Sequence, residues 1–113
     1  MSIQLQKLLL KAKLFRGFGD PVRLSILESL RTGERTTSEI VREIGQSQSN
    51  VSNHLACLLD CGLVQNRREG KNIFYSIRNK VVSNILREGD TILSEIARGI
   101  FECMNYNEEP KKK

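Results

Sequence analysis

Three cysteines are the residues of this chain with the most distinctive chemistry. Cys57 and Cys61 lie four residues apart in a stretch with helical periodicity, residues 46–62, and Cys103 lies near the C-terminus. Side chains four apart share a helix face, so the first two thiols can bind one ion together. Three sulfurs with no evident nitrogen or carboxylate ligand suit Cd(II) or Pb(II) better than Zn(II), which favours four tetrahedral ligands. The spacing predicts a thiolate metal site.

The alternative is that these cysteines are ordinary small apolar residues, which are common in protein cores. The pattern of residues 46–62 favours the metal site, because it places Cys57 and Cys61 on the outward face of the helix, where free thiols are a liability. The inward stripe consists of Val51, Leu55, Leu58 and Leu59. Cys103, beside Phe101 and Met104, fits a dimer core as well as it fits a ligand.

The start of the same helix carries short amides and hydroxyls, which reach base edges and phosphate oxygens without bulk. We expect DNA contacts from Ser47, Gln48, Ser49, Asn50 and Asn53. Helix capping is an equally good role for Gln48 and Ser49. His54 flanks the metal face, but a DNA contact or a hydrogen bond within the motif is favoured over metal ligation.

The elements around this helix complete a mainly α fold with a small β-hairpin. Helical periodicity covers residues 2–18, a second helix follows the Asp20-Pro21 start, and a third begins at Thr36 or Thr37 and stops at Gly45. Two short helices joined by a glycine turn, the second polar outside, make a helix-turn-helix. Residues 63–78 alternate as two strands around Glu69-Gly70, which predicts a wing.

The wing tip is basic, with Arg67, Arg68 and Lys71 within five residues. We expect these side chains to reach phosphates or the minor groove; the alternative is a solvated hairpin tip. The last helix, residues 80–104, carries an apolar stripe wider than so small a domain needs, which predicts a homodimer. One domain is therefore expected over residues 1–104, with a frayed basic tail over 105–113.

Composition excludes several classes of protein. The net charge of +5 falls to +2 without the three terminal lysines, so charge supports nucleic-acid binding only weakly. No apolar run approaches the ~20 residues that span a bilayer, and no signal peptide is evident, so we expect a cytoplasmic protein without a membrane partner. An enzyme with Cys57 as nucleophile and His54 as base would lack an orienting group and an oxyanion motif, so we predict no catalysis. An interaction module that never binds DNA is a further alternative.

Taken together, three motifs resemble those of the ArsR/SmtB family of winged-helix repressors. They are residues 20–27 (DPVRLSIL), residues 47–55 (SQSNVSNHL), and Gly62-Leu63-Val64 followed by residues 67–71 (RREGK). The resemblance covers residues 19 to about 104. It implies a homodimer built through the first and last helices, which binds an inverted repeat and leaves it when an inducer binds.

Within this family, inducer sites differ in position. Residues 80–104 contain no His, and residues 39–43 contain no Cys, so two of the usual sites look absent. Cys57, Cys61 and Cys103 instead look like the cadmium- and lead-responsive CmtR type, which implies that Cys103 is donated by the other subunit. Zn(II) and As(III) are further candidate ions, and a redox or persulfide sensor is the main rival. The i, i+4 pair is poorly placed for an unstrained disulfide, which disfavours that rival.

Overall fold

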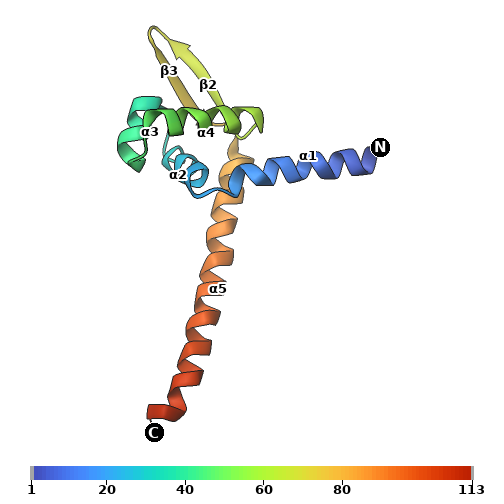
Figure 1. Ribbon diagram of the computed structural model, residues 1–113, viewed down its shortest axis with the longest axis vertical. Helices are drawn as coiled ribbons and strands as arrows, with labels where there is room; N and C mark the ends of the chain where they lie inside the picture. The colour runs from blue at the N-terminus through green and yellow to red at the C-terminus, as the bar shows by residue number, and fades with distance from the viewer. Residues whose placement is uncertain (1, 113) are drawn as a thin grey trace. The chain divides into compact units, whose positions relative to one another are not determined.

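The computed structural model describes residues 2–112, with side chains described for residues 2–99. The elements are α1 (Ile3–Phe18), α2 (Pro21–Ser29), β1 (Arg35–Thr36), α3 (Thr37–Ile44), α4 (Gln48–Asp60), β2 (Val64–Glu69), β3 (Asn72–Ile77) and α5 (Lys80–Lys112). The chain divides after Val82 into two compact units, of which the second consists of the rest of α5. Figure 1 shows the hairpin of β2 and β3 beside the helices α3 and α4.

Three helices and the start of the wing share one core. Its side chains are at most 2% exposed and come mainly from α2, α3 and α4: Ile26, Leu27, Leu30, Ile40, Val51, Leu55, Leu58, Leu63 and Val64. Helical periodicity predicted this inward face on each of the three helices. Four residues predicted to face inward are only half-buried: Val22, Val41, Ile44 and Leu59. The core therefore fixes which face of α4 points outward.

Capping residues define where α2 and α3 begin. Asp20 Oδ2 accepts hydrogen bonds from the backbone N–H groups of Val22 and Arg23, and these bonds lower the pKa of Asp20. Thr36 and Glu39 form a complete capping box at the start of α3. Gly45 ends α3 in the left-handed conformation, with φ of 72°, which most residues avoid. These local signals fix where α2 and α3 begin and where α3 ends.

The sheet has one strand more than the sequence predicted. β2 and β3 pair antiparallel from Val64↔Ile77 to Glu69↔Asn72, as expected for a wing. Two further residues, Arg35 and Thr36, add β1 to the free edge of β3, which gives the order β1-β3-β2. A two-residue strand carries no alternation to detect, so sequence periodicity misses it.

The first helix is almost entirely exposed to solvent within a single protomer. Its apolar side chains Ile3, Leu5, Leu8, Leu9, Leu10 and Phe15 are all exposed, and only Gly17 is buried. In the second unit, Ile92, Leu93 and Ile96 of α5 are likewise exposed. No helix in the described part of the chain combines the length and the apolar character that crossing a membrane requires. The predicted tail over 105–113 lies among residues whose side chains are outside the description and stays a prediction.

Candidate functional site

The start of α4 presents the predicted polar group to solvent. Ser47 caps the helix, because its Oγ accepts a hydrogen bond from the backbone N–H of Asn50 at 3.2 Å. Gln48, Ser49 and Asn53 are exposed and Asn50 is half-buried. Capping is thus the task of Ser47, which leaves the Gln48 and Asn53 side chains available for a ligand.

Sequence reasoning missed one residue at this end of α4. Gln46 Oε1 accepts a hydrogen bond of 2.8 Å from Asn50 Nδ2, so the two amides form a pair on the exposed surface. The pairing leaves the Asn50 carbonyl oxygen able to accept from a base edge. Gln46 precedes the N-cap of α4, so the spacing of residues within the helix gives no signal for this pair.

His54 lies apart from the exposed polar group. Its ring is half-buried against α2, with Nδ1 3.5 Å from Arg23 Nη1 and Nε2 3.8 Å from Asp20 Oδ2. Arg23 in turn donates to the carbonyl oxygens of Arg16 and Gly17 at the end of α1. This arrangement fits the alternative of a hydrogen bond within the helix-turn-helix better than the predicted DNA contact for His54.

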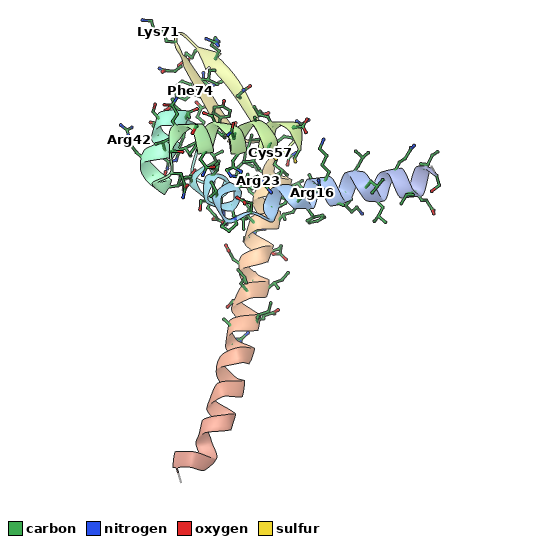
Figure 2. The ribbon with its side chains drawn as sticks, viewed as in Figure 1. Arg16, Arg23, Arg42, Cys57, Lys71 and Phe74 are labelled. Atoms are coloured by element: carbon green, nitrogen blue, oxygen red, sulfur yellow. The ribbon has the colours of Figure 1, made fainter. Side chains whose placement is uncertain are left out.

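The basic residues of the wing divide into two kinds. Arg67 is held by the carboxylates of Glu34 and Glu69, and its guanidinium carbon lies 4.7 Å from the centre of the Phe74 ring. The hydrogen bond from Arg67 lowers the pKa of Glu34, so the pair stays charged. Arg68 and Lys71 are exposed, and within residues 2–99 no hydrogen bond or ion pair engages either side chain. Figure 2 shows Lys71 at the tip of the hairpin.

Cys57 and Cys61 lie at the far end of α4 as free thiols. Burial raises the pKa of the Cys61 thiol, and the neighbouring Cys57, one turn earlier on the same helix, raises it further. Both residues are half-buried, whereas the sequence predicted an open outward face. For Cys61 the difference arises because the end of α1 lies over its thiol, a contact that periodicity along α4 cannot reveal.

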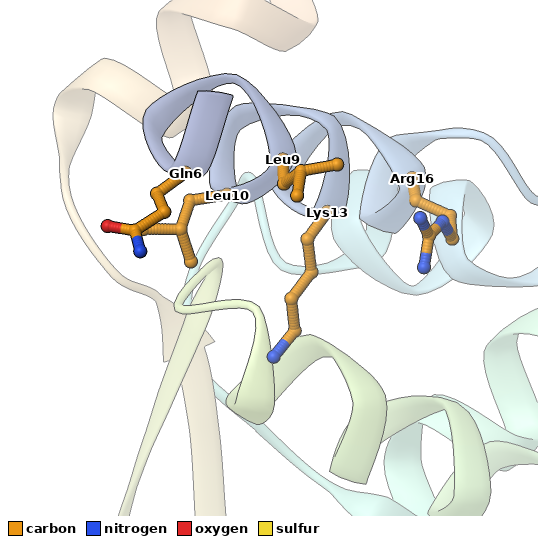
Figure 3. Close-up of a pocket in the computed structure, with 5 residues that line it drawn as sticks. All are labelled: Gln6, Leu9, Leu10, Lys13 and Arg16. Atoms are coloured by element: carbon orange, nitrogen blue, oxygen red, sulfur yellow. The ribbon is translucent and has the colours of Figure 1, made fainter. Parts of the chain in front are cut away.

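The contact with α1 brings a cation to the thiols. The Cys61 thiol donates to the carbonyl oxygen of Lys13 at 3.6 Å, and Lys13 Nζ pairs with Asp60 Oδ2 at 2.9 Å. Figure 3 shows the Lys13 side chain reaching from α1 toward the end of α4. The Lys13 ammonium opposes the rise in the pKa of Cys61. The thiol pair therefore has a positive charge beside it.

The donors present fit a soft ion only in part. Two thiols on consecutive turns supply two sulfur ligands, yet the described residues hold no group of three His, Cys, Asp or Glu able to bind an ion. His54 and Asp60 are engaged with other partners. The predicted third ligand, Cys103, lies outside the described side chains, and its role stays a prediction.

Comparison with known proteins is consistent with this fold. The model for "Bacterial regulatory protein, arsR family" matches residues 20–66. A probable mercury resistance operon repressor from Streptomyces lividans is 39% identical over 92 residues, covering 81% of this chain and 74% of that protein. The regulator CmtR of Mycobacterium tuberculosis is 38% identical over 77 residues, covering 68% of this chain and 65% of its own length.

Solved structures agree with the family match. The homodimeric winged helix-turn-helix DNA-binding domain Mb0332 from Mycobacterium bovis aligns with a TM-score of 0.79 at 28% identity, covering 88% of this chain and 93% of that one. Rv0081 of Mycobacterium tuberculosis aligns equally well, with a TM-score of 0.79 at 31% identity over 88% of this chain and 99% of that one. The winged helix-turn-helix prediction is confirmed. These relatives are regulators and not enzymes, as the sequence predicted.

Proposed function

This chain belongs to the ArsR family of bacterial regulatory proteins, and from that premise we propose that it is a metal-responsive transcriptional repressor. As a homodimer it binds operator DNA, and a soft metal ion such as Cd(II) or Pb(II) releases it. The ligands are Cys57 and Cys61 of one protomer and Cys103 of the other. The homodimeric state of Mb0332 and the bare apolar face of α1 support the dimer.

The observation that carries this proposal is that the two ends of α4 bear different functional groups. Gln48, Ser49 and Asn53 are exposed at its start, and a pair of free thiols lies at its end. A helix is rigid over a span of 13 residues, so an ion that pulls on one end reorients the other. A divalent ion with three thiolates also adds net negative charge near the phosphates.

DNA recognition follows from the same arrangement. We assign base contacts to Gln48, Ser49, Asn50 and Asn53, and phosphate contacts to Ser47, Arg68 and Lys71. Arg67 instead holds the wing in place through Glu34, and His54 links α4 to Arg23 of α2. The phosphate contacts of the wing, from Arg68 and Lys71, lie on a different element from the base contacts of α4, so the two can be tested separately.

The test compares operator affinity with and without cadmium, measured by fluorescence anisotropy on DNA from the promoter of the gene for this protein. Coupling of about 1 to 3 kcal/mol would weaken binding by roughly 5- to 150-fold in the parent. Cys57→Ser should keep the metal-free affinity and lose this response. Ala56→Ser, which adds a hydroxyl at the adjacent exposed position, is the matched control and should respond like the parent.

A cadmium response that survives in Cys57→Ser would show that the ion acts elsewhere. Thiolate-to-metal absorption in the ultraviolet, measured against the loss of free thiols to peroxide, separates metal binding from the redox alternative. Competition between cadmium and arsenite then ranks the two inducers. Loss of one thiolate per ion in Cys103→Ser would support Cys103 as the third ligand.

A further inference from the structure

The end of α1 touches the thiol pair through two groups of one residue. The backbone carbonyl of Lys13 accepts a hydrogen bond from the Cys61 thiol at 3.6 Å. The side-chain ammonium of the same residue pairs with Asp60, the residue before Cys61, at 2.9 Å. Figure 3 shows this side chain descending from α1 to the end of α4. Lys13 therefore contacts both Cys61 and its neighbour.

Gly17, one turn further along α1, permits the close approach. It is the buried residue of this helix, and a Cβ atom at its position would lie 2.6 Å from Leu63 Cδ1 and 3.5 Å from Cys61 Sγ. The first distance is shorter than van der Waals contact allows, so with any larger residue either the Leu63 side chain or the end of α1 must shift. The sequence thus contains a glycine where α1 meets the site.

The charge of Lys13 matters for an ion held by thiolates. Three thiolates around a divalent ion leave one net negative charge, and the Lys13 ammonium stabilises it in part, because Asp60 shares the same ammonium. Lysine is cationic at neutral pH, and the Lys13 ammonium is held beside the thiol pair by its ion pair with Asp60. Its side chain is 46% exposed, so salt must screen the attraction.

We propose that the last two turns of α1 belong to the thiol site. In this site Lys13 positions the bound ion, and Gly17, which has no side chain, allows α1 to lie close to the thiols. This inference rests on the proposed function, because it takes Cys57 and Cys61 as ligands of the ion. α1 also carries the exposed row of Leu5, Leu8 and Phe15. If the bound ion moves the end of α1, the movement reaches the surface proposed for the dimer, because both lie on the same helix.

The first experiment removes the ammonium and keeps the backbone carbonyl. Lys13→Gln should weaken cadmium binding by about fivefold at low salt, and the loss should shrink as salt is raised. Lys13→Arg should restore most of the affinity. Lys11→Gln removes the same charge from an exposed position elsewhere on α1 and serves as the control. Affinities come from competition titrations followed by thiolate-to-metal absorption on the full chain. Equal affinities for the Lys13 and Lys11 variants would overturn the role of Lys13.

The second experiment crowds the contact between α1 and Leu63 without touching a charge. Gly17→Ala should leave the saturating absorption of the cadmium complex in place and reduce the ratio of metal-free to metal-loaded operator affinity at least threefold. Gly19→Ala is the control, because its Cβ would meet only backbone oxygens of Arg16 and Phe15 at 3.5 and 3.8 Å. Circular dichroism verifies that both variants fold. A Gly17→Ala variant with the parent's ratio would exclude α1 as the transmitting element.

The two proposals fail in different ways. Absence of thiolate-to-metal absorption in the parent would refute the metal site itself. Normal absorption and normal operator release in the parent, combined with unchanged behaviour of Lys13→Gln and Gly17→Ala, would refute only the part assigned to α1. If Gly17→Ala does not fold, the Lys13 series still decides the question.

Discussion

Arg67 and Arg68 are neighbours in the sequence with different surroundings. Alternation along β2 places them on opposite faces of the wing. Arg67 meets Phe74 across the sheet and two carboxylates, so its charge is already balanced. Arg68 has no such partner among residues 2–99. A side chain that must neutralise phosphate needs a free charge, which favours Arg68 and Lys71 over Arg67.

Salt dependence distinguishes these arginines. Arg68→Ala should weaken binding to all DNA sequences alike and reduce the slope of log affinity against log salt by about one, the value for one lost phosphate contact. The double variant Glu34→Gln, Arg67→Gln removes the ion pair without changing net charge and should keep the slope. Anisotropy titrations over a salt series give both values. A loss confined to one operator base in Arg68→Ala would contradict the phosphate role.

Among the elements, α4 must both pack into the core and present side chains for DNA recognition. Val51, Leu55 and Leu58 are buried against α2 and α3, while the other side of the same helix carries Gln48 and Asn53. Packing and recognition therefore use different residues of one helix. The consequence is that stability and DNA affinity can be altered separately by changing one face at a time.

Two substitutions two residues apart test this separation. Leu55 is 1% exposed, so Leu55→Ala should lower the free energy of unfolding by about 2 to 5 kcal/mol through lost burial and a cavity. Asn53→Ala, on the exposed face, should change stability by less than about 0.5 kcal/mol. It should nevertheless lose about 1 to 3 kcal/mol of discrimination at one operator base pair. Urea unfolding and titrations with single-base operator variants measure the two effects. Destabilisation by Asn53→Ala of the size seen for Leu55→Ala would contradict this division.

At the scale of the whole molecule, a single protomer leaves many apolar side chains exposed to water, which is unfavourable. Leu8 is 62% exposed and Ile92 57%, and each belongs to a row of similar residues on its own helix. Contiguous apolar patches on a folded protein mark interfaces. Homodimerisation through the terminal helices, as proposed, removes these rows from water and places two copies of α4 on one DNA site.

A charge within the row of α1 should break the dimer. Leu8→Glu should give a monomer in sedimentation experiments, remove the dependence of melting temperature on protein concentration, and weaken operator binding. Lys7→Glu, on another side of the same helix, should remain dimeric. Leu8→Glu that still sediments as a dimer would place the interface elsewhere.

The sequence alone determined the helix-turn-helix, the wing and the inward faces of α2, α3 and α4, because periodicity, capping residues and glycine turns are local signals. It also indicated which side of α4 bears Asn53 and Cys57. Only the tertiary structure decided that α1 lies over Cys61, that His54 faces Arg23, and that Arg67 is bound by Glu34. Each of these contacts joins residues 31 to 48 positions apart. Spacing within one element holds no information about which side chain another element will bring to it.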